Sequence, residues 1–377
     1  MNGLAWLAFV PAAIWLYLLA ARGMFWAARE RDDRRIMPEP GCWPAVTAIV
    51  PARNEADVIE RSIGSLLAQD YPGSFEIVLV DDQSEDGSGE LARALEHGGK
   101  LTVIRAATRP AGWTGKLWAI SQGVTHARGT DYFWFTDADI AHTPDNLRHL
   151  VSRAEHGNLV LTSLMARLSC ASSAEKSFVP AFVYFFQMLY PFAWVNDPKK
   201  RTSAAAGGCM LVRREAFERG GGISTIRSAL IDDCALGELM KRQGPIWLGL
   251  TNRSVSIRPY ADMNDIRRMV ARSAYAQLNY SPVLLAGTLA GLLAVFAAPV
   301  LLAICGTGFV RVAGFAVWLA MALSYLPILR FYRRSPVWTL ALPAIGVLYG
   351  TFTLDSAMQH WRGRGGMWKG RAQAMAR

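Results

Sequence analysis

The sequence carries two aspartates one residue apart, Asp137 and Asp139, directly after the apolar segment at residues 132–136. Carboxylates at this spacing can bind one hard cation, Mg²⁺ or Mn²⁺, which also binds phosphate oxygens. The alternative is that an aspartate here only caps the helix that begins near Pro144. Because other acids follow neighbouring apolar segments, we predict that Asp139 and Asp137 bind a divalent metal and that Asp137 also contacts a phosphorylated donor.

A second acidic pair, Asp81 and Asp82, ends the apolar segment at residues 75–80. A carboxylate is costly there unless it accepts hydrogen bonds, which the N–H groups of a base and the hydroxyls of a ribose can donate. A turn with a helix cap is the alternative, but Ser84 and Gly87 would suffice for that. The pair therefore predicts a nucleoside site. The loop also lacks the third glycine of a dinucleotide fingerprint, and its acids would repel pyrophosphate, which disfavours a hydride-transfer enzyme.

A third acidic pair, Asp232 and Asp233, opens a helical pattern. Transfer of a group to a hydroxyl with inversion needs one base to take the hydroxyl proton, and we predict that Asp233 is this base. Asp232 would orient it or bind the acceptor, and their mutual repulsion would raise one pKa. A helix cap explains one of the two aspartates but leaves the other unexplained.

Two glycine-containing segments supply further candidates. Lys116 stands in a Gly-rich turn at a helix start, where its ammonium and backbone N–H groups can bind phosphate oxygens; as a single lysine it could equally be a solvated surface charge. Gly207, Gly208 and Cys209 precede an apolar segment and would let an acceptor lie close to the backbone. A plain turn is the alternative for these three residues.

The elements that must position these residues follow an α/β pattern. Segments rich in β-forming residues at 45–50, 75–80, 101–104 and 132–136 are separated by helical patterns such as residues 57–69. This order predicts a mainly parallel sheet with helices on both faces, in which ligands bind beyond the carboxyl ends of the strands. The end of the first segment therefore adds four donor-binding candidates, namely Pro51, Ala52, Arg53 and Glu55.

Long apolar segments predict an integral membrane protein. Residues 4–21 are uncharged and a basic stretch follows them, which favours an uncleaved N-terminal anchor over a signal peptide. Residues 282–305, 312–329 and 337–354 are three more candidate spans. The basic flank predicts an inner or plasma membrane location with the catalytic domain in the cytoplasm. Four full crossings would leave the basic tail outside, so one segment could be re-entrant or interfacial.

The charge distribution identifies the expected partner surface. The net charge is +10 and 52% of the residues are hydrophobic, and the basic residues cluster beside apolar segments. This arrangement predicts a lipid bilayer as partner and no nucleic acid. The five cysteines include no Cys-x-x-Cys pair, which disfavours a disulfide framework or a zinc site.

Two further segments are expected at the membrane surface. Residues 177–195 are rich in aromatic side chains and precede a basic cluster, which favours interfacial packing, with an ordinary core helix as the alternative. Residues 263–279 form an amphipathic pattern whose arginines, Arg272 among them, would hold the membrane surface or bind the donor diphosphate. The expected organisation is an anchor with basic flank (1–36), a linker (37–44), a catalytic domain (45–262), an interface helix (263–279), membrane segments (280–356) and a basic tail (357–377).

Four motifs occur together in a defined order: Ala-Arg-Asn-Glu at residues 52–55, Val-Asp-Asp at 80–82, Asp-Ala-Asp at 137–139 and Asp-Asp at 232–233. Over residues 45–260 the chain resembles the inverting family 2 glycosyltransferases with the GT-A fold. The resemblance implies a nucleotide-sugar donor, in the first place a UDP-sugar, with Asp81 at the nucleoside, Asp139 at the metal and Asp233 as the base.

Other motifs suggest a subfamily. They are Gly-Trp-Thr-Gly-Lys at residues 112–116, Trp-Val-Asn-Asp-Pro at 194–198, Gly-Gly-Cys-Met at 207–210 and Trp-Lys-Gly-Arg at 368–371. With them the chain is similar to the hopanoid-biosynthesis-associated membrane glycosyltransferases and, more distantly, to ceramide glucosyltransferases. This resemblance implies a membrane lipid acceptor, and a hopanoid-related lipid is the first expectation.

The sequence departs from the Gln-x-x-Arg-Trp motif of processive family members. Its nearest match, at residues 269–273, lacks the glutamine and the tryptophan, which disfavours a polymer synthase although Arg272 could keep a diphosphate role. A sugar-nucleotide pyrophosphorylase would carry a Gly-rich basic loop, which is absent after Val50, and would not need membrane segments. A non-catalytic membrane scaffold that retains the fold, and a polyprenyl-phosphate or sphingolipid-type glycosyltransferase, remain as alternatives.

Overall fold

The computed structural model describes the chain except for residues 1–4, 97, 365–366, 369–370 and 373–377, so Leu4, Lys369 and Gly370 of the predicted anchor and tail motifs lie outside the described residues. It divides into two compact units. The sheet unit consists of Glu30–Ser169, Trp194–Pro259 and Met367–Arg377, and the helical unit of Met1–Arg29, Cys170–Ala193 and Tyr260–Gly366.

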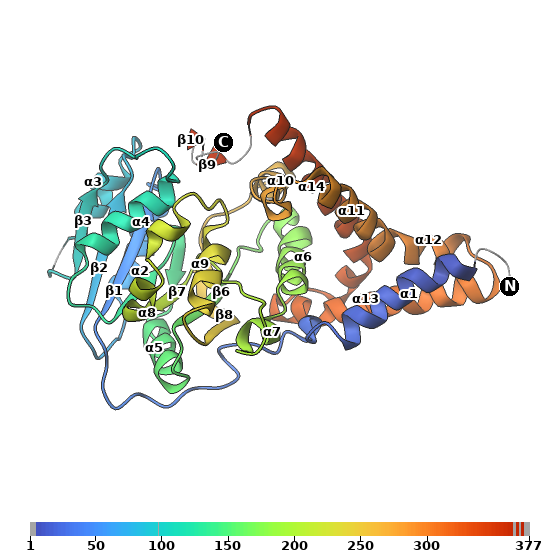
Figure 1. Ribbon diagram of the computed structural model, residues 1–377, viewed down its shortest axis with the longest axis horizontal. Coiled ribbons are helices and arrows are strands. Elements are labelled where there is room, and N and C mark those ends of the chain that lie inside the picture. The colour runs from blue at the N-terminus through green and yellow to red at the C-terminus, as the bar shows by residue number, and fades with distance from the viewer. Residues whose placement is uncertain (1–4, 97, 365–366, 369–370, 373–377) are drawn as a thin grey trace. The chain divides into compact units, whose positions relative to one another are not determined.

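The sheet unit contains an eight-stranded sheet of order β3-β2-β1-β4-β7-β6-β8-β5 among the described residues (Figure 1). Its strands are β1 (Val46–Ala52), β2 (Phe75–Asp81), β3 (Leu101–Arg105), β4 (Tyr132–Phe135), β5 (Ile140–His142), β6 (Leu161–Arg167), β7 (Met210–Arg213) and β8 (Ile246–Ser256), and a separate two-stranded sheet pairs β9 (Met367–Trp368) with β10 (Arg371–Ala372). The four segments predicted as strands form β1 to β4.

The sheet is mixed rather than purely parallel, so the prediction of a mainly parallel sheet is confirmed only in part. β1, β2, β3 and β4 are parallel neighbours, as are β6 and β8, but β7 runs antiparallel to both β4 and β6. β5 runs antiparallel to β8. The chain reaches β7 through two helices, Ser173–Leu189 and Phe192–Asn196, and then the turn at residues 207–209. Side chains alternate between the two faces whichever way a strand runs, so the apolar pattern did not record this reversal.

Helices cover both faces of the sheet (Figure 1). They are α2 (Ile59–Leu67), α3 (Ser88–Arg93), α4 (Gly115–His126), α5 (Asn146–His156), α7 (Phe192–Asn196), α8 (Arg214–Arg219) and α9 (Asp232–Lys241), with a 3₁₀ turn, η2, at Ile223–Ile226. Every residue of β1 is buried, as expected for a strand covered on both sides. Ile63 of α2 and Leu150 of α5 share a core with Val50, whereas Gly123 of α4 faces Ile49.

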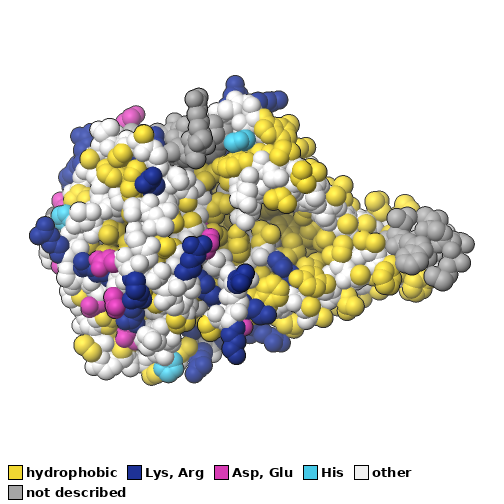
Figure 2. Space-filling view, viewed as in Figure 1, with side chains coloured by type: hydrophobic (Ala, Val, Ile, Leu, Met, Phe, Trp, Pro, Cys, Tyr) yellow, Lys and Arg dark blue, Asp and Glu magenta, His cyan; other side chains and the backbone are white. Residues whose placement is uncertain are grey.

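The helical unit comprises α1 (Ala5–Ala20), η1 (Phe25–Ala27), α6 (Ser173–Leu189), α10 (Met263–Ala271), η3 (Ala276–Leu278), α11 (Pro282–Leu292), the π-helical η4 (Leu293–Ala297), α12 (Ala298–Cys305), α13 (Gly308–Phe331), η5 (Pro336–Ala341) and α14 (Leu342–Trp361). By length and composition, three described stretches could cross a bilayer: Pro282–Cys305, Gly308–Phe331 and Pro336–Trp361. The three predicted C-terminal membrane segments are confirmed in this sense. Figure 2 shows hydrophobic side chains over much of the visible surface of these helices.

The N-terminal membrane helix is shorter than predicted. α1 has 16 residues and contains Pro11, whereas a full crossing needs roughly 20 apolar residues. Its Trp15 is 1% exposed and donates from Nε1 to the carbonyl of Val295, 2.8 Å away. α1 therefore packs within the helical unit, and a full crossing by this helix is not supported by its length.

The aromatic residues of α6 are mostly core residues. Tyr184 is fully buried and shares a 2.7 Å hydrogen bond between its hydroxyl and that of Ser324. Phe178 and Phe185 pack their rings against Tyr349. For these side chains the packing follows the ordinary core-helix alternative rather than interfacial exposure.

Candidate active site

The predicted donor-binding residues that follow β1, β2 and β4 lie at one edge of the sheet. β1, β2 and β4 are parallel neighbours, so their carboxyl ends lie at the same edge. Ala52 pairs with Asp81 in the register, and the carbonyl of Ala52 accepts a 2.8 Å hydrogen bond from the backbone N–H of Asp82. Pro51 and Ala52 themselves are buried β1 residues, so their side chains support the strand end.

The two loops beyond β1 and β2 are joined by hydrogen bonds. The guanidinium of Arg53, only 5% exposed, donates to the carbonyls of Asp82 and Gln83. The backbone N–H of Glu55 donates to the hydroxyl of Ser88 over 2.7 Å. These contacts hold the Ala-Arg-Asn-Glu turn and the acidic loop as one preformed surface.

Asp81 also has a structural role in its loop. Its Oδ1 accepts a hydrogen bond from the backbone N–H of Ser84 at 2.9 Å, and its Oδ2 would lie only 2.6 Å from a Cβ added to Gly89. Asp81 and Asp82 are 5% and 1% exposed. The turn considered as the alternative is therefore present, and nucleoside binding by this pair stays a prediction.

Lys116 connects two of the predicted acidic motifs. It lies in the first turn of α4, which Thr114 caps by accepting from the backbone N–H of Leu117. Its Nζ lies 2.8 Å from Asp137 Oδ1 and 2.9 Å from Asp232 Oδ2. Burial lowers the pKa of Lys116, but the charges of Asp137 and Asp232 outweigh burial and hold the pKa above its ordinary value.

Asp233 completes this arrangement from the start of α9. Its Oδ2 accepts a 3.1 Å hydrogen bond from the backbone N–H of Gly207, and its Oδ1 accepts one of 2.7 Å from that of Cys234. Burial, and then the charge of Asp232, raise the pKa of Asp233 to about 6, while the charge of Lys116 opposes the increase. A carboxyl group of this kind can exchange a proton near neutral pH.

Gly207 lies among these side chains. A Cβ at this position would lie 3.3 Å from Lys116 Nζ and 3.6 Å from both Asp137 Oδ2 and the Cβ of Asp233. We refer to the set of Lys116, Asp137, Gly207, Asp232 and Asp233 as the Lys116 cluster. It brings together residues predicted separately for donor, acceptor and base functions.

A residue that the sequence did not indicate, Arg258, binds the second aspartate of the Asp-x-Asp pair. Its Nε lies 3.0 Å from Asp139 Oδ2, and its Nη2 forms an ion pair with Glu55 Oε2. A single arginine two residues after a strand has no sequence signature of its own. It becomes recognisable only when the pairing of β5 with β8 is known.

The predicted metal ligands can be tested by the chemistry of their donor atoms. Asp137 and Asp139 supply only carboxylate oxygens, and no group of three or more His, Cys, Asp or Glu side chains in the described part of the chain could hold a metal by itself. Mg²⁺ is commonly held by one or two carboxylates together with substrate phosphates. The residues therefore fit a cation whose remaining ligands come from a donor diphosphate.

Three other predicted residues, Gly208, Cys209 and Arg272, are not part of the Lys116 cluster. Gly208 is packed against Ala166 and Ile140, where a Cβ would come within 3.1 Å and 3.2 Å. Cys209 is fully buried in the core, where burial raises the pKa of its thiol to about 11. Arg272 is the C-cap residue of α10 in the helical unit.

Beneath the Asp-x-Asp turn lies His142, another residue without a sequence signal. It is buried, and its ring nitrogens share 2.9 Å hydrogen bonds with the hydroxyls of Thr136 and Ser254. Burial lowers the pKa of His142 to about 3, so the ring is neutral. Thr136 in turn donates to the carbonyl of Gly208, which links the start of the Asp-x-Asp turn to the glycine turn.

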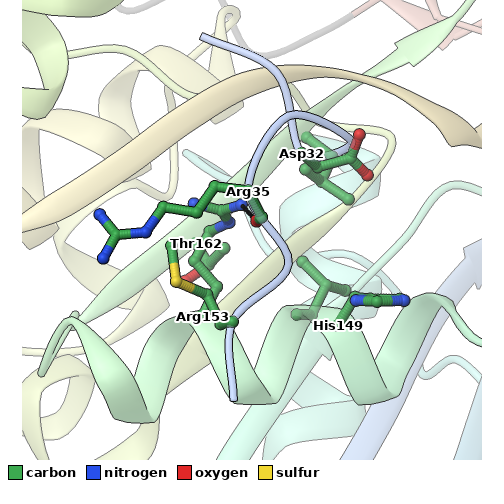
Figure 3. Close-up of a pocket in the computed structure, with 8 residues that line it drawn as sticks. Asp32, Arg35, His149, Arg153 and Thr162 are labelled. Carbon is green, nitrogen blue, oxygen red and sulfur yellow. Dashed lines mark hydrogen bonds between the residues drawn. The ribbon is translucent and has the colours of Figure 1, made fainter.

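A small cavity in the sheet unit is lined by residues of a different kind, among them Asp32, Arg35, His149, Arg153 and Thr162 (Figure 3). Among the described residues, Asp32 Oδ1 and Thr162 Oγ1 have no hydrogen-bond partner. Such a polar cavity suits an ordered water molecule. It contains none of the residues predicted for donor, acceptor or metal binding.

The middle of the chain is similar to known glycosyltransferases. Residues 47–221, a little under half of the chain, match the family model described as Glycosyl transferase family 2. The 4,4'-diaponeurosporenoate glycosyltransferase of Staphylococcus aureus strain USA300 is 28% identical over 207 residues, and that of the bovine strain RF122 / ET3-1 is 27% identical. The matches cover 53% of this chain and 52% of these relatives, so the chain spans about half the length of the curated relatives it matches.

A solved structure matches almost the whole chain. The mannosyltransferase PcManGT from Pyrobaculum calidifontis, in complex with GDP-Man and Mn²⁺, aligns with a TM-score of 0.56 and 20% identity over 95% of this chain and 99% of that chain. At this identity the likeness shows the fold. The mixed α/β sheet is therefore a fold also found in this mannosyltransferase.

Proposed function

We propose that this chain is a family 2 glycosyltransferase bound to a membrane, which transfers a sugar from a nucleotide-sugar to a lipid. The observation that carries the proposal is the Lys116 cluster, in which residues far apart in the sequence meet beside the carboxyl end of β4. The match of residues 47–221 to the family model supports it. The donor is proposed to be a UDP-sugar.

On the donor side, the joined loops beyond β1 and β2 would bind the nucleoside. Arg53 and Glu55 lie in the first loop and Asp81 and Asp82 at the start of the second. Lys116 would turn its ammonium to the donor diphosphate, whose negative charge grows as the sugar departs. A divalent cation, Mg²⁺ or Mn²⁺, held by Asp139 and Asp137 would neutralise part of the same charge.

On the acceptor side, Asp233 would act as the general base. The acceptor hydroxyl loses its proton to Asp233, its oxygen bonds to the anomeric carbon, and the bond to the diphosphate breaks with its electron pair on the phosphate oxygen. Attack opposite to the leaving group inverts the anomeric configuration. The backbone N–H of Gly207 holds Asp233 Oδ2, so one carboxylate oxygen keeps its orientation while the proton moves.

The acceptor is proposed to be a membrane lipid, hopanoid-related in the first place. Three stretches long and apolar enough to cross a bilayer support a lipid acceptor, as does the similarity to the 4,4'-diaponeurosporenoate glycosyltransferase of Staphylococcus aureus. Polyprenyl-phosphate and sphingolipid-type acceptors are the alternatives. We place the protein in the inner or plasma membrane with the sheet unit in the cytoplasm, on the basis of the basic residues that follow the first apolar segment.

The test is transfer of radiolabel from UDP-sugars and GDP-sugars to lipid in membranes that contain the protein. Hopanoids, polyprenyl phosphate, ceramide and 4,4'-diaponeurosporenoate serve as acceptors. Asp233→Asn should reduce transfer by at least about a hundredfold while donor binding persists, because the base is lost and the donor loops are unchanged. Glu218→Gln, which removes an exposed acid on α8, should leave transfer unchanged.

Two results would decide against the proposal. Wild-type transfer by Asp233→Asn would remove Asp233 as the base. Absence of transfer from every donor to every acceptor would favour the non-catalytic scaffold. A chelator should abolish transfer if a divalent cation takes part, and equal rates with and without chelator would contradict the metal-dependent form of the mechanism.

A further inference from the structure

Arg258 stands at the position of the sheet unit where a divalent cation is proposed to bind. β8 runs antiparallel to β5, and the backbone N–H of Ile257 donates to the carbonyl of Asp139 over 2.9 Å. This register sets Arg258 beside the carboxylate of Asp139, with Nε 3.0 Å from Oδ2. The position of the guanidinium is therefore fixed by the strand pairing as well as by charge.

The same guanidinium also binds Glu55 in the loop after β1. The Glu55 side chain is 9% exposed and that of Asp139 is 24% exposed. Carboxylates withdrawn from water need a partner of opposite charge, and one arginine serves both. We call this arrangement the Arg258 bridge, meaning Arg258 with Glu55 and Asp139.

The Arg258 bridge conflicts with a cation held at Asp139. A guanidinium and a divalent cation at one carboxylate repel each other and compete for its oxygens, and the arginine keeps its charge at any physiological pH. Lys116 differs, because its ion pairs are with Asp137 and Asp232 and leave Asp139 to Arg258. Of the two cationic side chains, Arg258 is therefore the one that forms an ion pair with Asp139.

We propose that Arg258 competes with the divalent cation for Asp139 and leaves this carboxylate when the donor binds. The inference rests on the proposed function, since it concerns the same donor site. The donor diphosphate supplies oxygen ligands for the cation and an anionic partner for the released guanidinium. Donor and cation then bind cooperatively, and each strengthens the other by the same factor.

The experiment measures Mn²⁺ binding by electron paramagnetic resonance on the detergent-solubilised full chain, first alone and then with UDP or GDP. The wild-type protein should bind Mn²⁺ weakly alone and at least about tenfold more tightly with the nucleotide. Arg258→Gln should bind Mn²⁺ alone about tenfold more tightly than the wild type, a change of about 1.4 kcal/mol, and the effect of the nucleotide should shrink. Asp139→Asn should abolish the binding.

Two controls make the result specific. Arg219→Gln removes an equal charge from an exposed ion pair with Glu215 and should bind Mn²⁺ as the wild type does. If Arg258→Gln lowers the melting temperature because Glu55 has lost its counter-ion, the double variant Glu55→Gln/Arg258→Gln removes both charges and carries the same expectation. Equal Mn²⁺ affinity of the wild type, Arg258→Gln and the double variant overturns the inference, as does unchanged binding by Asp139→Asn.

The sugar-transfer assay separates this inference from the proposed function. Transfer by the wild type together with equal Mn²⁺ affinities in wild type and Arg258→Gln would leave the transferase and remove the competition. Tighter Mn²⁺ binding by Arg258→Gln, together with no sugar transfer by the wild type, would support the competition and contradict the proposed transferase activity.

Discussion

At the residue scale, two cationic side chains pair with the acids of the site. Lys116 lies between Asp137 and Asp232, and Arg258 lies between Asp139 and Glu55. Without them, carboxylates held close together would repel one another strongly in this partly buried region. The Lys116 cluster can therefore hold a base of raised pKa in a fixed position before any donor binds.

The raised pKa of Asp233 gives the transfer rate a predictable pH dependence. Asp233 must be ionised to act as a base, so the rate should fall as the pH drops through about 6. Asp232→Asn removes the like charge that raises the pKa of Asp233, so the acidic limb of its residual activity should move to lower pH. Lys116→Gln removes the opposing positive charge and should move this limb to higher pH.

The measurement is kcat/KM at pH values from about 5 to about 8 for the wild type, Asp232→Asn and Lys116→Gln. Glu218→Gln is the control for a general change of charge on the sheet unit. An acidic limb that stays in place in both Asp232→Asn and Lys116→Gln would mean that a group other than Asp233 titrates.

Gly207 gives a second prediction at this scale. In Gly207→Ala the new methyl group would lie 3.3 Å from Lys116 Nζ and 3.6 Å from the Asp233 Cβ, in the space between these two side chains. We expect kcat to fall by about a hundredfold, because small displacements of reacting groups have effects of this size. The melting temperature should change little, since no backbone atom is in the way.

The matched control is Gly64→Ala on α2, where no atom lies within 4 Å of the added Cβ. It should keep wild-type kcat and a similar melting temperature. If Gly207→Ala and Gly64→Ala have the same kcat, then the space around Gly207 is not used by the reaction.

At the scale of elements, the segment at residues 30–35 is part of the sheet unit. The backbone N–H of Asp32 donates to the carbonyl of Leu250 on β8 over 3.1 Å. The side chain of Asp32, 5% exposed, binds Arg253 at 3.0 Å and the hydroxyl of Thr251 at 2.6 Å. This segment was predicted as the basic flank of the anchor, and nothing in its composition indicated a buried ion pair.

Asp32 should therefore contribute far more than Asp33 to the free energy of unfolding. Asp32→Ala leaves Arg253 without one of its two carboxylate partners in a partly buried position, and we expect a loss on the order of 3 kcal/mol in the free energy of unfolding of the sheet unit. Asp33→Ala breaks only a more exposed pair with Arg31 and should cost less than about 1 kcal/mol. Denaturant unfolding followed by circular dichroism measures both, and equal losses would show that the ion pair with Arg253 adds nothing.

Patterns within short segments of the sequence correctly predicted several strands and one helix start. β1 to β4 and the start of α9 at Asp232 follow from runs of apolar residues and from an acidic helix start, which are properties of short segments. The antiparallel entry of β7 and the role of Arg258 depend on pairing between segments that are far apart in the sequence, which no local pattern records. For the same reason the acids were predicted while their counter-ion Arg258 was missed.

At the scale of the whole molecule, the helical unit draws on three separate parts of the chain. α6 enters it between β6 and β7, long before the C-terminal helices begin. Phe178 packs against Phe352 of α14, and Tyr184 against Tyr325 of α13, with ring centroids 6.0 Å and 5.3 Å apart. The aromatic face of α6 thus depends on helices that follow much later in the sequence.

A chain that ends at Pro259 should consequently be insoluble without detergent. It would lose α13 and α14 and expose Phe178, Tyr184 and Phe185, each of which contributes roughly 1.5–3 kcal/mol when buried. A contiguous aromatic surface of this kind promotes aggregation. Replacing the three residues by serine should raise the soluble, monodisperse fraction in size-exclusion chromatography, whereas Leu189→Ser, at a position already exposed, should not. A truncated chain that is soluble without these substitutions would show that α6 is stable without the helices that cover it.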